Sequence, residues 1–306
     1  MSTTIRNAHE KINTTRFLTH DVSLKPFCSF HTGGSADIFG TPSNLHELRM
    51  LIAYARENDL PITVLGGGTN VLISDKGIKG LTIHTAHLKN FHIRGTLLCA
   101  QAGCSIDRII QGSIEHALSG MELLGGLPGT IGGAVRGNAG VHQVHIGDLV
   151  EWVDYLDHSG NLMRTHKEEL DFSYKHSFFS ETTGIIYEVA FRLIPNKATS
   201  EAMRLKEQSR KERLDAGQYA FASAGCIFKN PEGLSAGAMI EKIGLKQKNV
   251  NGAMVSPFHA NFIVNQTGSA SSNDVRSLAQ EVATQVKKQL DIDLEYEVQF
   301  MGDWSD

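Results

Sequence analysis

The chain has 306 residues, of which 41% are hydrophobic and 20% are charged, as in an ordinary soluble globular protein. The formal net charge of -4 provides no basic field for nucleic acid or an anionic membrane, so we expect neither partner. No apolar run approaches the roughly 18 residues of a membrane-spanning helix, and the polar residues 1–11 contain no secretory signal.

The cysteines and glycines narrow the class further. The four cysteines (Cys28, Cys99, Cys104 and Cys226) form no CxxC pair and have no histidine pair at zinc spacing, so we expect no metal site. Reduced thiols in the cytosol are the default for such a chain, which predicts a cytoplasmic protein. Many of the 30 glycines gather in two short stretches, which indicates that the backbone itself binds a ligand.

The N-terminal part of the chain is expected to contain an arm, two short strands and a helix. Residues 1–22 have no periodic apolar pattern and read as a loosely held arm. Pro26–Phe39 predicts two short strands around the turn at Gly33 and Gly34. Ser43 is expected to cap a helix that ends before Pro61.

The first glycine stretch follows directly. The apolar strand Ile62–Leu65 runs into Gly66-Gly67-Gly68-Thr69-Asn70, and Val71–Ile73 resumes it. Successive exposed N–H groups in such a loop form an anion nest, for which a pyrophosphate is the usual ligand. A flexible loop is the alternative, but it seldom separates two such apolar strands. No Gly-Lys-Ser/Thr follows, which excludes a P-loop.

The second glycine stretch lies between Gly125 and Gly140. A strand over Leu97–Ala102 and a helix capped by Ser105 lead to it. It lacks the spaced Gly-x-Gly-x-x-Gly of a dinucleotide-binding βαβ unit. We expect instead a Gly129-Thr130 turn that enters a short helix, with N–H groups directed at a phosphate.

The remaining pattern predicts strands, then a separate C-terminal lobe. Two strands (Val150–Leu156 and Ile185–Leu193) precede a helix over Ser200–Asp215. The lobe has a short helix over Ser235–Gly244 and a strand over Ala260–Asn265. The last two predicted elements are a long amphipathic helix from a Ser272 cap to Leu290 and an alternating strand over Ile292–Phe300.

Cys226 is the reactive side chain at the start of that lobe. An Ala-Gly turn delivers it, and an apolar pair and Lys229-Asn230-Pro231 follow. A buried strand cysteine is the alternative reading, because free cysteine is among the most buried residue types. The local pattern leaves both readings open.

Seven motifs follow one another in a single order between residues 24 and 303. They are Thr32–Asp37, Val64–Asn70, Gly125–Gly140, Ser173–Ser177, Ala224–Pro231, His259–Asn265 and Leu294–Val298. This order closely resembles the UDP-N-acetylenolpyruvoylglucosamine reductase family. The first two glycine motifs alone would fit the wider FAD-binding family that includes many oxidases, whereas the later motifs are specific to the reductase.

The resemblance implies an α+β fold: a two-lobed FAD-binding domain of the vanillyl-alcohol-oxidase/PCMH-like kind and a C-terminal α+β substrate-binding lobe. We expect an arm over 1–22, FAD-binding subdomains over 23–88 and 89–197, and the substrate lobe over 198–306. The short interval between Leu193 and Cys226 resembles the family type that lacks an extra substrate-capping loop.

The resemblance also implies the reaction. NADPH reduces non-covalently bound FAD, and the flavin N5 passes hydride to the vinyl carbon of UDP-N-acetylglucosamine enolpyruvate, giving UDP-N-acetylmuramate for peptidoglycan. By position in the motifs, Cys226 is the proton donor, while Lys175 and Glu297 stabilise the intermediate. Glu295 lies on the same face of the expected strand as Glu297, and only the resemblance favours Glu297. We expect a cytoplasmic monomer with this small-molecule substrate.

The resemblance also implies which residues contact the ligands. The expected FAD-binding residues are Gly66, Gly67, Gly68, Thr69, Asn70, Gly129, Thr130, Gly133, Asn138 and Gly140. The expected substrate-binding residues are Tyr174, Ser177, Lys229, Asn230 and His259.

Two of the three chemical positions depart from the family. The usual donor is serine rather than Cys226, and a thiol with a pKa of about 8.5 supplies a proton at least as readily. The usual cation is arginine rather than Lys175. Lysine keeps the positive charge but lacks the planar guanidinium group, which binds a carboxylate through two hydrogen bonds. His176 beside it reads as an exposed histidine more readily than as a helper. A further departure is Val141-His142-Gln143, where the family has Ala-Tyr-Gly.

Two other functions stay open. One is a catalytically weakened relative that binds flavin or a UDP-sugar without turnover, which the changes at Lys175 and Cys226 motivate. The other is a different FAD oxidase of the same wider fold, against which the C-terminal motifs argue.

Overall fold

The computed structural model describes residues 16–141 and 144–305. Its chain divides into two compact units. The first unit contains residues 16–22, Asp37–Gly67 and Lys79–Arg210, and the second contains Ser23–Ala36, Gly68–Ile78 and residues 211–305, as far as these are described. Two N-terminal segments therefore pack with the C-terminal part of the chain.

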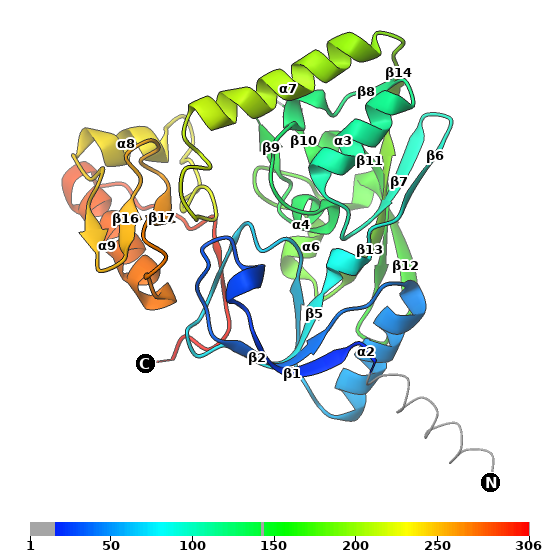
Figure 1. Ribbon diagram of the computed structural model, residues 1–306, viewed down its shortest axis with the longest axis horizontal. Coiled ribbons are helices and arrows are strands. Elements are labelled where there is room, and N and C mark those ends of the chain that lie inside the picture. Colours follow the sequence, from blue (N-terminus) through cyan, green and yellow to red (C-terminus); the bar gives the residue numbers. More distant parts are fainter. Residues whose placement is uncertain (1–15, 142–143, 306) are drawn as a thin grey trace. The chain divides into compact units, whose positions relative to one another are not determined.

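A five-stranded antiparallel sheet forms the larger part of the first unit (Figure 1). In spatial order its strands are β12 (Leu162–His166), β11 (Val150–Leu156), β13 (Ile185–Arg192), β7 (Leu97–Gln101) and β6 (Phe91–Arg94). The apolar faces of α3 (Ile106–Glu115) and α4 (Ile131–Arg136) share one buried core with this sheet. Ser105 caps α3 as expected, because its side chain accepts the N–H of Arg108.

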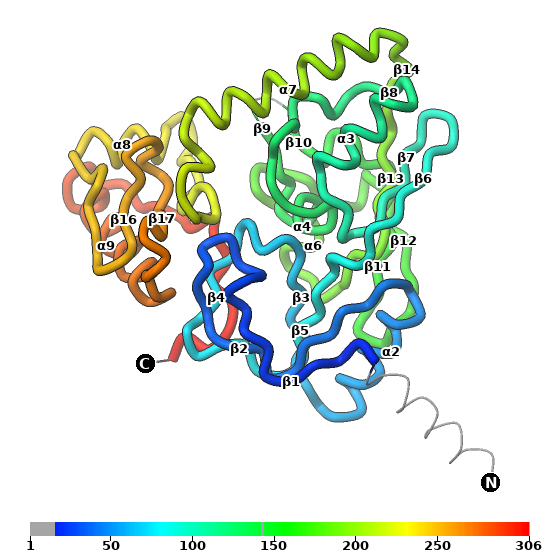
Figure 2. Tube along the Cα trace, in the orientation of Figure 1, coloured from blue at the N-terminus to red at the C-terminus, as the bar shows by residue number. Residues whose placement is uncertain are grey.

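A four-stranded sheet completes the first unit (Figure 2). Its order is β1 (Leu18–Ser23), β2 (Ser35–Gly40), β5 (Ile78–His84) and β3 (Ile62–Leu65), with β3 and β5 parallel. Helix α2 (Leu45–Glu57) packs Leu48, Leu51 and Ile52 against β5. This packing fixes the end of β3, where the first glycine stretch begins.

Short elements connect these layers. They are η2 (Thr85–His87), β8 (Leu118–Ser119), η3 (Glu122–Leu124), β9 (Gly140–Val141), β10 (Val144–His145), α5 (Ile146–Leu149), η4 (Lys167–Glu169), α6 (Phe178–Glu181) and β14 (Ile194–Pro195). Helix α7 (Thr199–Asp215) begins in the first unit and ends in the second.

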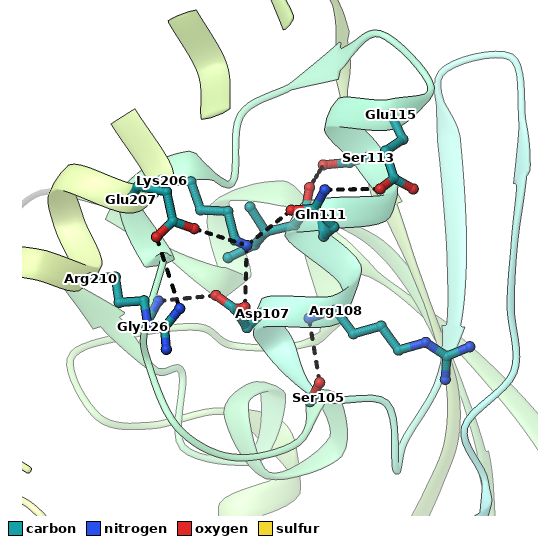
Figure 3. A network of polar contacts seen from close by, with 11 residues as sticks. Ser105, Asp107, Arg108, Gln111, Ser113, Glu115, Gly126, Lys206, Glu207 and Arg210 are labelled. Carbon is teal, nitrogen blue, oxygen red and sulfur yellow. Dashed lines mark hydrogen bonds and ion pairs between the residues drawn. The ribbon is translucent and has the colours of Figure 1, made fainter. Parts of the chain in front are cut away.

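A buried lysine fixes the first part of α7 (Figure 3). The side chain of Lys206 is 5% exposed, and its Nζ lies 3.2 Å from Oδ2 of Asp107 and 3.1 Å from Oε1 of Gln111, both on α3. Oδ1 of Asp107 accepts the N–H of Gly126 at 3.3 Å. The same carboxylate therefore joins α7 to the start of the second glycine stretch.

The second unit packs a long helix on a small sheet. Its elements are η1 (Lys25–Phe27), β4 (Val71–Ile73), α8 (Ala236–Lys242), β15 (Asn249–Val250), β16 (Ala253–Val255), β17 (Ile263–Asn265), α9 (Ser272–Leu290) and β18 (Gln299–Met301). Helix α9 contacts all three strands of the β15-β16-β17 sheet. Strand β18 pairs in parallel with β4, which brings residues far apart in sequence side by side.

Asp75 ties one of the N-terminal segments to α9. Its Oδ1 and Oδ2 accept the N–H groups of Ser272 and Asn273, each at 2.9 Å. These groups belong to the first turn of the helix and have no partner within it. A carboxylate there also interacts favourably with the helix dipole.

The sequence predicted the longer helices and eight of the strands, but four details of its predictions were wrong. The cap of α2 is Asn44 rather than Ser43, and the cap of α9 is Ser271 rather than Ser272, whose hydroxyl instead donates to Thr32. The expected strand before Gly33 is the 3-10 turn η1, which Pro26 favours at its start. The expected strand Ile292–Phe300 is regular only over β18.

Ten of the strands in the described residues were missed, and one of them, β1, begins in the predicted arm. They are β1, β5, β6, β8, β9, β10, β12, β14, β15 and β16. Residues 1–15 of that arm, and His142 and Gln143 of the unusual Val141-His142-Gln143 segment, lie outside the described residues. The predicted domain boundaries stay predictions. None of the helices in the described part is long and apolar enough to cross a membrane.

Replacing Asp75 by alanine leaves two N–H groups at the start of α9 without this carboxylate. We expect Asp75→Ala to lower the free energy of unfolding by about 1 to 2 kcal/mol in urea titrations. Glu232→Ala, at an exposed position of the same unit, serves as the control, with an expected effect below about 0.5 kcal/mol. Equal effects of the two substitutions would contradict a stabilising role for Asp75.

Candidate active site

The two glycine stretches meet within the first unit. A Cβ atom on Gly66 would lie 2.7 Å from Oγ1 of Thr130, and one on Gly67 would lie 3.0 Å from the Cα of Gly129. An atom added at Gly66 would meet the side chain of Thr130, whereas one added at Gly67 would press on the backbone of the opposite loop. Glycine at position 67 therefore allows the two backbones to approach each other closely.

Thr130 provides a hydroxyl that the protein does not use. Its Oγ1 is buried and has no hydrogen-bond partner among the described residues, and the side chain does not cap α4. Leaving such a group unpaired costs about 1 to 3 kcal/mol. The backbone N–H groups of Gly67 and Gly133 also take part in no backbone hydrogen bond within the described residues. This set of donors fits a diphosphate oxygen, so the residues present fit the expected FAD.

Helix α4 confirms the predicted Gly-Thr turn and short helix, but not all of its N–H groups are available. The N–H of Ile131 donates to the carbonyl of Cys104 at 2.9 Å, and that of Gly132 to the carbonyl of Ala102 at 2.8 Å. These bonds anchor the helix to the loop between β7 and α3. Thr130 and Gly133 are the stronger candidates for ligand contact.

Asn138 and Gly140 take part in internal contacts. Asn138 adopts a left-handed φ of 41°, its Oδ1 accepts the N–H of Gly147 at 3.1 Å, and its Nδ2 donates to the carbonyl of Ser173 at 2.8 Å. A Cβ on Gly140 would lie 2.4 Å from a ring carbon of His145. Both residues therefore shape the loops around the candidate flavin site.

Tyr174 and Lys175 occupy the tip of a tight turn in the first unit. Ser173 and His176 pair as an isolated antiparallel bridge, with an N–H···O bond of 3.2 Å in each direction. Lys175 has a left-handed φ of 56°, a conformation that lysine rarely adopts. Tyr174 is 48% exposed. His176 lies 3.6 Å from the Asp171 carboxylate, and its side chain is 27% exposed, so it is partly buried rather than exposed.

Ser177 lies beneath this turn. Its side chain is fully buried, and its hydroxyl donates to the carbonyl of Arg136 at 2.7 Å. The hydroxyl therefore joins this segment to the end of α4.

Cys226 begins an extended segment of the second unit. Gly225 before it has a φ of 76°, which glycine adopts without strain. Cys226 forms an isolated bridge with Phe262, and the N–H of Ile227 donates to the carbonyl of Asn261 at 2.8 Å. Cys226 is half-buried, whereas Cys28, Cys99 and Cys104 are at most 4% exposed. The alternative of a fully buried cysteine therefore does not hold.

Glu297 lies on the segment that pairs with this one. Its N–H donates to the carbonyl of Ile227 at 2.8 Å, and its carbonyl accepts Nδ2 of Asn70 at 3.1 Å. Its side chain is partly buried, whereas that of Glu295 is 73% exposed and pairs with Lys229. The structure thus distinguishes two carboxylates that the alternating pattern left equivalent.

Two of the expected substrate residues of the second unit, Asn230 and His259, already form hydrogen bonds within the protein. Asn230 is exposed and its Oδ1 accepts the N–H of Ala236 at 2.9 Å. His259 Nδ1 accepts the N–H of Asn261 at 3.3 Å, and the ring lies against Phe262. Burial lowers the pKa of His259, which favours the neutral ring. Because Nδ1 of that ring accepts a hydrogen bond, Nε2 carries the proton.

The second unit also holds the rest of the first glycine loop. A Cβ on Gly68 would lie 1.9 Å from the carbonyl oxygen of Phe27, and the carbonyl of Asn70 accepts the N–H of Gln299 at 3.0 Å. Thr69 lies between them and is partly buried. Gly68 therefore has a structural reason to be glycine, independent of any ligand.

The structure thus places Cys226 and Glu297 on neighbouring segments of the second unit, and Tyr174, Lys175 and Ser177 in the first unit. Across the described ranges, no cluster of histidine, cysteine or carboxylate side chains could hold a metal ion. The sequence analysis missed Arg136, a single arginine inside an otherwise small and apolar stretch, which contacts the loop that carries Lys175.

Comparison with known proteins agrees with a flavin site. The family model "FAD binding domain" matches residues 36–166, and the model "UDP-N-acetylenolpyruvoylglucosamine reductase, C-terminal domain" matches residues 217–301. The chain is 37% identical to the UDP-N-acetylenolpyruvoylglucosamine reductase of Nostoc punctiforme, covering 95% of this chain and 88% of that protein. It is 36% identical to the reductase of Caldanaerobacter subterraneus subsp. tengcongensis, covering 92% of each.

A solved structure agrees as well. The crystal structure of the UDP-N-acetylenolpyruvylglucosamine reductase from Thermus caldophilus is 33% identical and gives a TM-score of 0.78. The match covers 93% of this chain and 98% of that one.

The fold and the site together define an FAD-binding oxidoreductase with a separate C-terminal domain. The chain belongs to the UDP-N-acetylenolpyruvoylglucosamine reductase family. The predicted α+β fold is confirmed.

Replacing Thr130 by valine removes the unpaired hydroxyl but keeps the side-chain shape. We expect Thr130→Val to raise the dissociation constant of FAD about tenfold or more, since a hydrogen bond to a charged group contributes about 1.5 to 3 kcal/mol. The flavin-free protein should keep its stability, because the hydroxyl has no partner there. Flavin fluorescence titration and urea unfolding measure the two quantities.

Thr130→Ser is the matched control and should retain FAD affinity. An unchanged affinity in the valine variant would rule out Thr130 as a flavin ligand.

Alkylation distinguishes Cys226 from the other thiols. Burial raises the pKa of Cys28, and raises that of both Cys99 and Cys104 to about 11. We expect iodoacetamide at neutral pH to modify Cys226 first in the folded flavin-free protein, with the other three reacting only on unfolding. Peptide mass spectrometry identifies the site. Equal modification of several cysteines before unfolding would contradict the observed burial.

Proposed function

We propose that this protein is an NADPH-dependent flavoenzyme that reduces UDP-N-acetylglucosamine enolpyruvate to UDP-N-acetylmuramate for peptidoglycan synthesis. One observation carries the proposal: the reductase C-terminal domain matches residues 217–301, and this segment holds Cys226 half-buried and directly followed by the partner of Glu297. An oxidase of the wider FAD-binding class has no reason to carry that domain.

The flavin would be held by the backbones of Gly66, Gly67 and Gly133 and the hydroxyl of Thr130. When bound, FAD supplies two-electron chemistry, accepting a hydride from NADPH and delivering one to the vinyl carbon of the substrate. Gly129 and Gly140 contribute by allowing the loops to approach. Gly68, Thr69, Asn70 and Asn138 are proposed to complete the cofactor site mainly through the loops they fix.

Cys226 is proposed to donate the proton that completes the reduction. The carbon that bears the substrate carboxylate gains negative charge as the neighbouring vinyl carbon accepts hydride, and it then takes the thiol proton. A cysteine with a pKa near 8.5 is mostly protonated at neutral pH and is a stronger acid than serine. The resulting thiolate regains its proton from solvent before the next turnover.

Lys175 and Glu297 are proposed to act on the developing charge. A lysine ammonium stabilises a carboxylate or an enolate as a point charge, without the two-pronged geometry of arginine. Glu297 has its backbone bonded on both sides, to Ile227 and to Asn70, so its carboxylate starts from a fixed position. We propose that it orients the proton donor or the substrate.

The remaining predicted contacts are proposed with different roles. Tyr174, Lys229, Asn230 and the Nε2–H of His259 are proposed to contact the UDP-sugar. Ser177 is proposed to act through the backbone of the Lys175 loop, because its hydroxyl is bonded to Arg136.

We also propose a cytoplasmic monomer of the family type without the extra capping loop. No disulfide joins the four cysteines, all of which lie in the described part of the chain, and this supports a reducing compartment.

The test of this function is NADPH oxidation by the flavin-loaded protein with and without UDP-N-acetylglucosamine enolpyruvate. Oxidation that requires the substrate supports the reductase. Tight flavin binding without substrate-dependent oxidation favours the weakened relative, and rapid reaction of reduced flavin with oxygen favours an oxidase.

Replacing Cys226 by alanine separates the two half-reactions. We expect Cys226→Ala to keep flavin reduction by NADPH but to slow flavin reoxidation by the substrate about 10²- to 10⁴-fold, as for loss of a general acid. Cys226→Ser should retain most of the activity. Anaerobic stopped-flow absorbance measures both steps, and equal slowing of both would remove Cys226 from the donor role.

Replacing Lys175 by arginine restores the fork that the family usually has at this position. We expect Lys175→Arg to keep or raise the rate of reoxidation, and Lys175→Met to lower it strongly, because the charge is lost. If arginine abolishes turnover while the protein stays folded, the point charge of lysine is specifically required.

A further inference from the structure

We propose that Arg136 is a positioning residue for Lys175, through a clamp that the end of α4 forms around the Tyr174-Lys175 turn. This inference rests on the proposed function of Lys175. The clamp consists of Arg136 and Asn138 on one side and Ser173, Ser177 and Ser180 on the other.

Two very short helices cap each other in this clamp. The guanidinium of Arg136 donates to the carbonyls of Phe179 and Ser180, which lie in the last turn of α6 and have no partner within that helix. In return, the hydroxyls of Ser177 and Ser180 donate to the carbonyl of Arg136, at 2.7 and 3.0 Å. Each bond satisfies a carbonyl at a helix end, so the two ends hold together as one unit.

The other end of the turn is held from the same helix. Asn138 lies two residues after the end of α4, and its Nδ2 donates to the carbonyl of Ser173 at 2.8 Å. That carbonyl also accepts the N–H of His176, which closes the turn. The turn that presents Lys175 is therefore held just before Tyr174 by Asn138 and just after His176 by Arg136.

Lys175 needs such support because its backbone is strained. A left-handed φ of 56° is unfavourable for lysine, and it persists only where the surroundings enforce it. The clamp supplies this enforcement from a buried site, as Ser177 is fully buried and burial lowers the pKa of Arg136. Arg136 contacts backbone carbonyls here, so its role is in fixing geometry.

The N-terminal end of helix α4 lies at the candidate flavin site. Thr130, its N-cap, carries the unpaired hydroxyl of the candidate flavin site. One six-residue helix thus joins the candidate flavin site to the Lys175 turn. We infer that α4 sets the position of the Lys175 turn relative to the flavin.

A double-mutant cycle between Arg136 and Lys175 tests the clamp. We expect Arg136→Met to slow flavin reoxidation by the enolpyruvyl substrate about tenfold, with FAD affinity and flavin reduction by NADPH little changed. In a Lys175→Met background the same substitution should have almost no further effect, because Arg136 acts through Lys175. Equal factors in both backgrounds would overturn the proposal.

Controls separate positioning from general damage. Arg108→Met removes another arginine of the first unit that donates to a backbone carbonyl, that of Lys89 at 2.8 Å, and it should leave reoxidation unchanged. Arg136→Lys should recover part of the rate. If Arg136→Met fails to fold, Ser180→Ala, which removes one bond of the clamp, takes its place in the cycle.

A readout independent of activity separates the clamp from the proposed function. In hydrogen-exchange mass spectrometry, Arg136→Met should speed exchange in the peptide over residues 171–181 but not in α3. Unchanged exchange in that peptide would refute the clamp even if the wild-type protein is an active reductase. Faster exchange in a protein without substrate-dependent turnover would support the clamp while refuting the function.

Discussion

The close approach of two glycine backbones is the constraint on which the rest of the first unit depends. A Cβ atom on Gly66 would meet the hydroxyl of Thr130, and one on Gly67 would press against the backbone of Gly129. The packing of α2 fixes the end of β3, where the first glycine stretch begins. Lys206 of α7 and Asp107 of α3 fix the start of the second stretch. What remains at the junction is a buried hydroxyl and backbone N–H groups, a set of donors suited to an anionic diphosphate.

Within each unit, hydrogen bonds also fix the segments that carry the proposed chemical groups. Helix α4 begins at Thr130 and ends in the clamp around Lys175, while Asn70, at the end of the first glycine loop, is bonded to the backbone of Glu297. Each link is a hydrogen bond to a main-chain atom. A hydrogen bond to a main-chain atom fixes the backbone of a segment, and with it the position from which a side chain of that segment starts.

Local signals in the sequence predicted the longer elements, and the resemblance implied that both glycine stretches bind the cofactor. Neither revealed the contacts between distant segments. Ser105 caps its helix as expected, because a cap depends on residues a few positions away. The cap that Asp75 adds to α9 comes from far along the chain, and no local pattern reveals it. Similarly, alternation left Glu295 and Glu297 equivalent, and only the pairing with Lys229 and Ile227 separates them. Arg136 was visible in the sequence as an unusual residue, yet its role depends on the fold of a loop some forty positions away, as the Ser177 bond shows.

The most direct test of this account is a crystal structure of the protein with FAD bound. We predict that a diphosphate oxygen lies within hydrogen-bonding distance of Oγ1 of Thr130, with the backbones of Gly66, Gly67 and Gly133 around it. A flavin bound elsewhere, or a Thr130 hydroxyl paired with the protein while the diphosphate is held by other residues, would contradict the central claim that the meeting of the two glycine stretches forms the cofactor site.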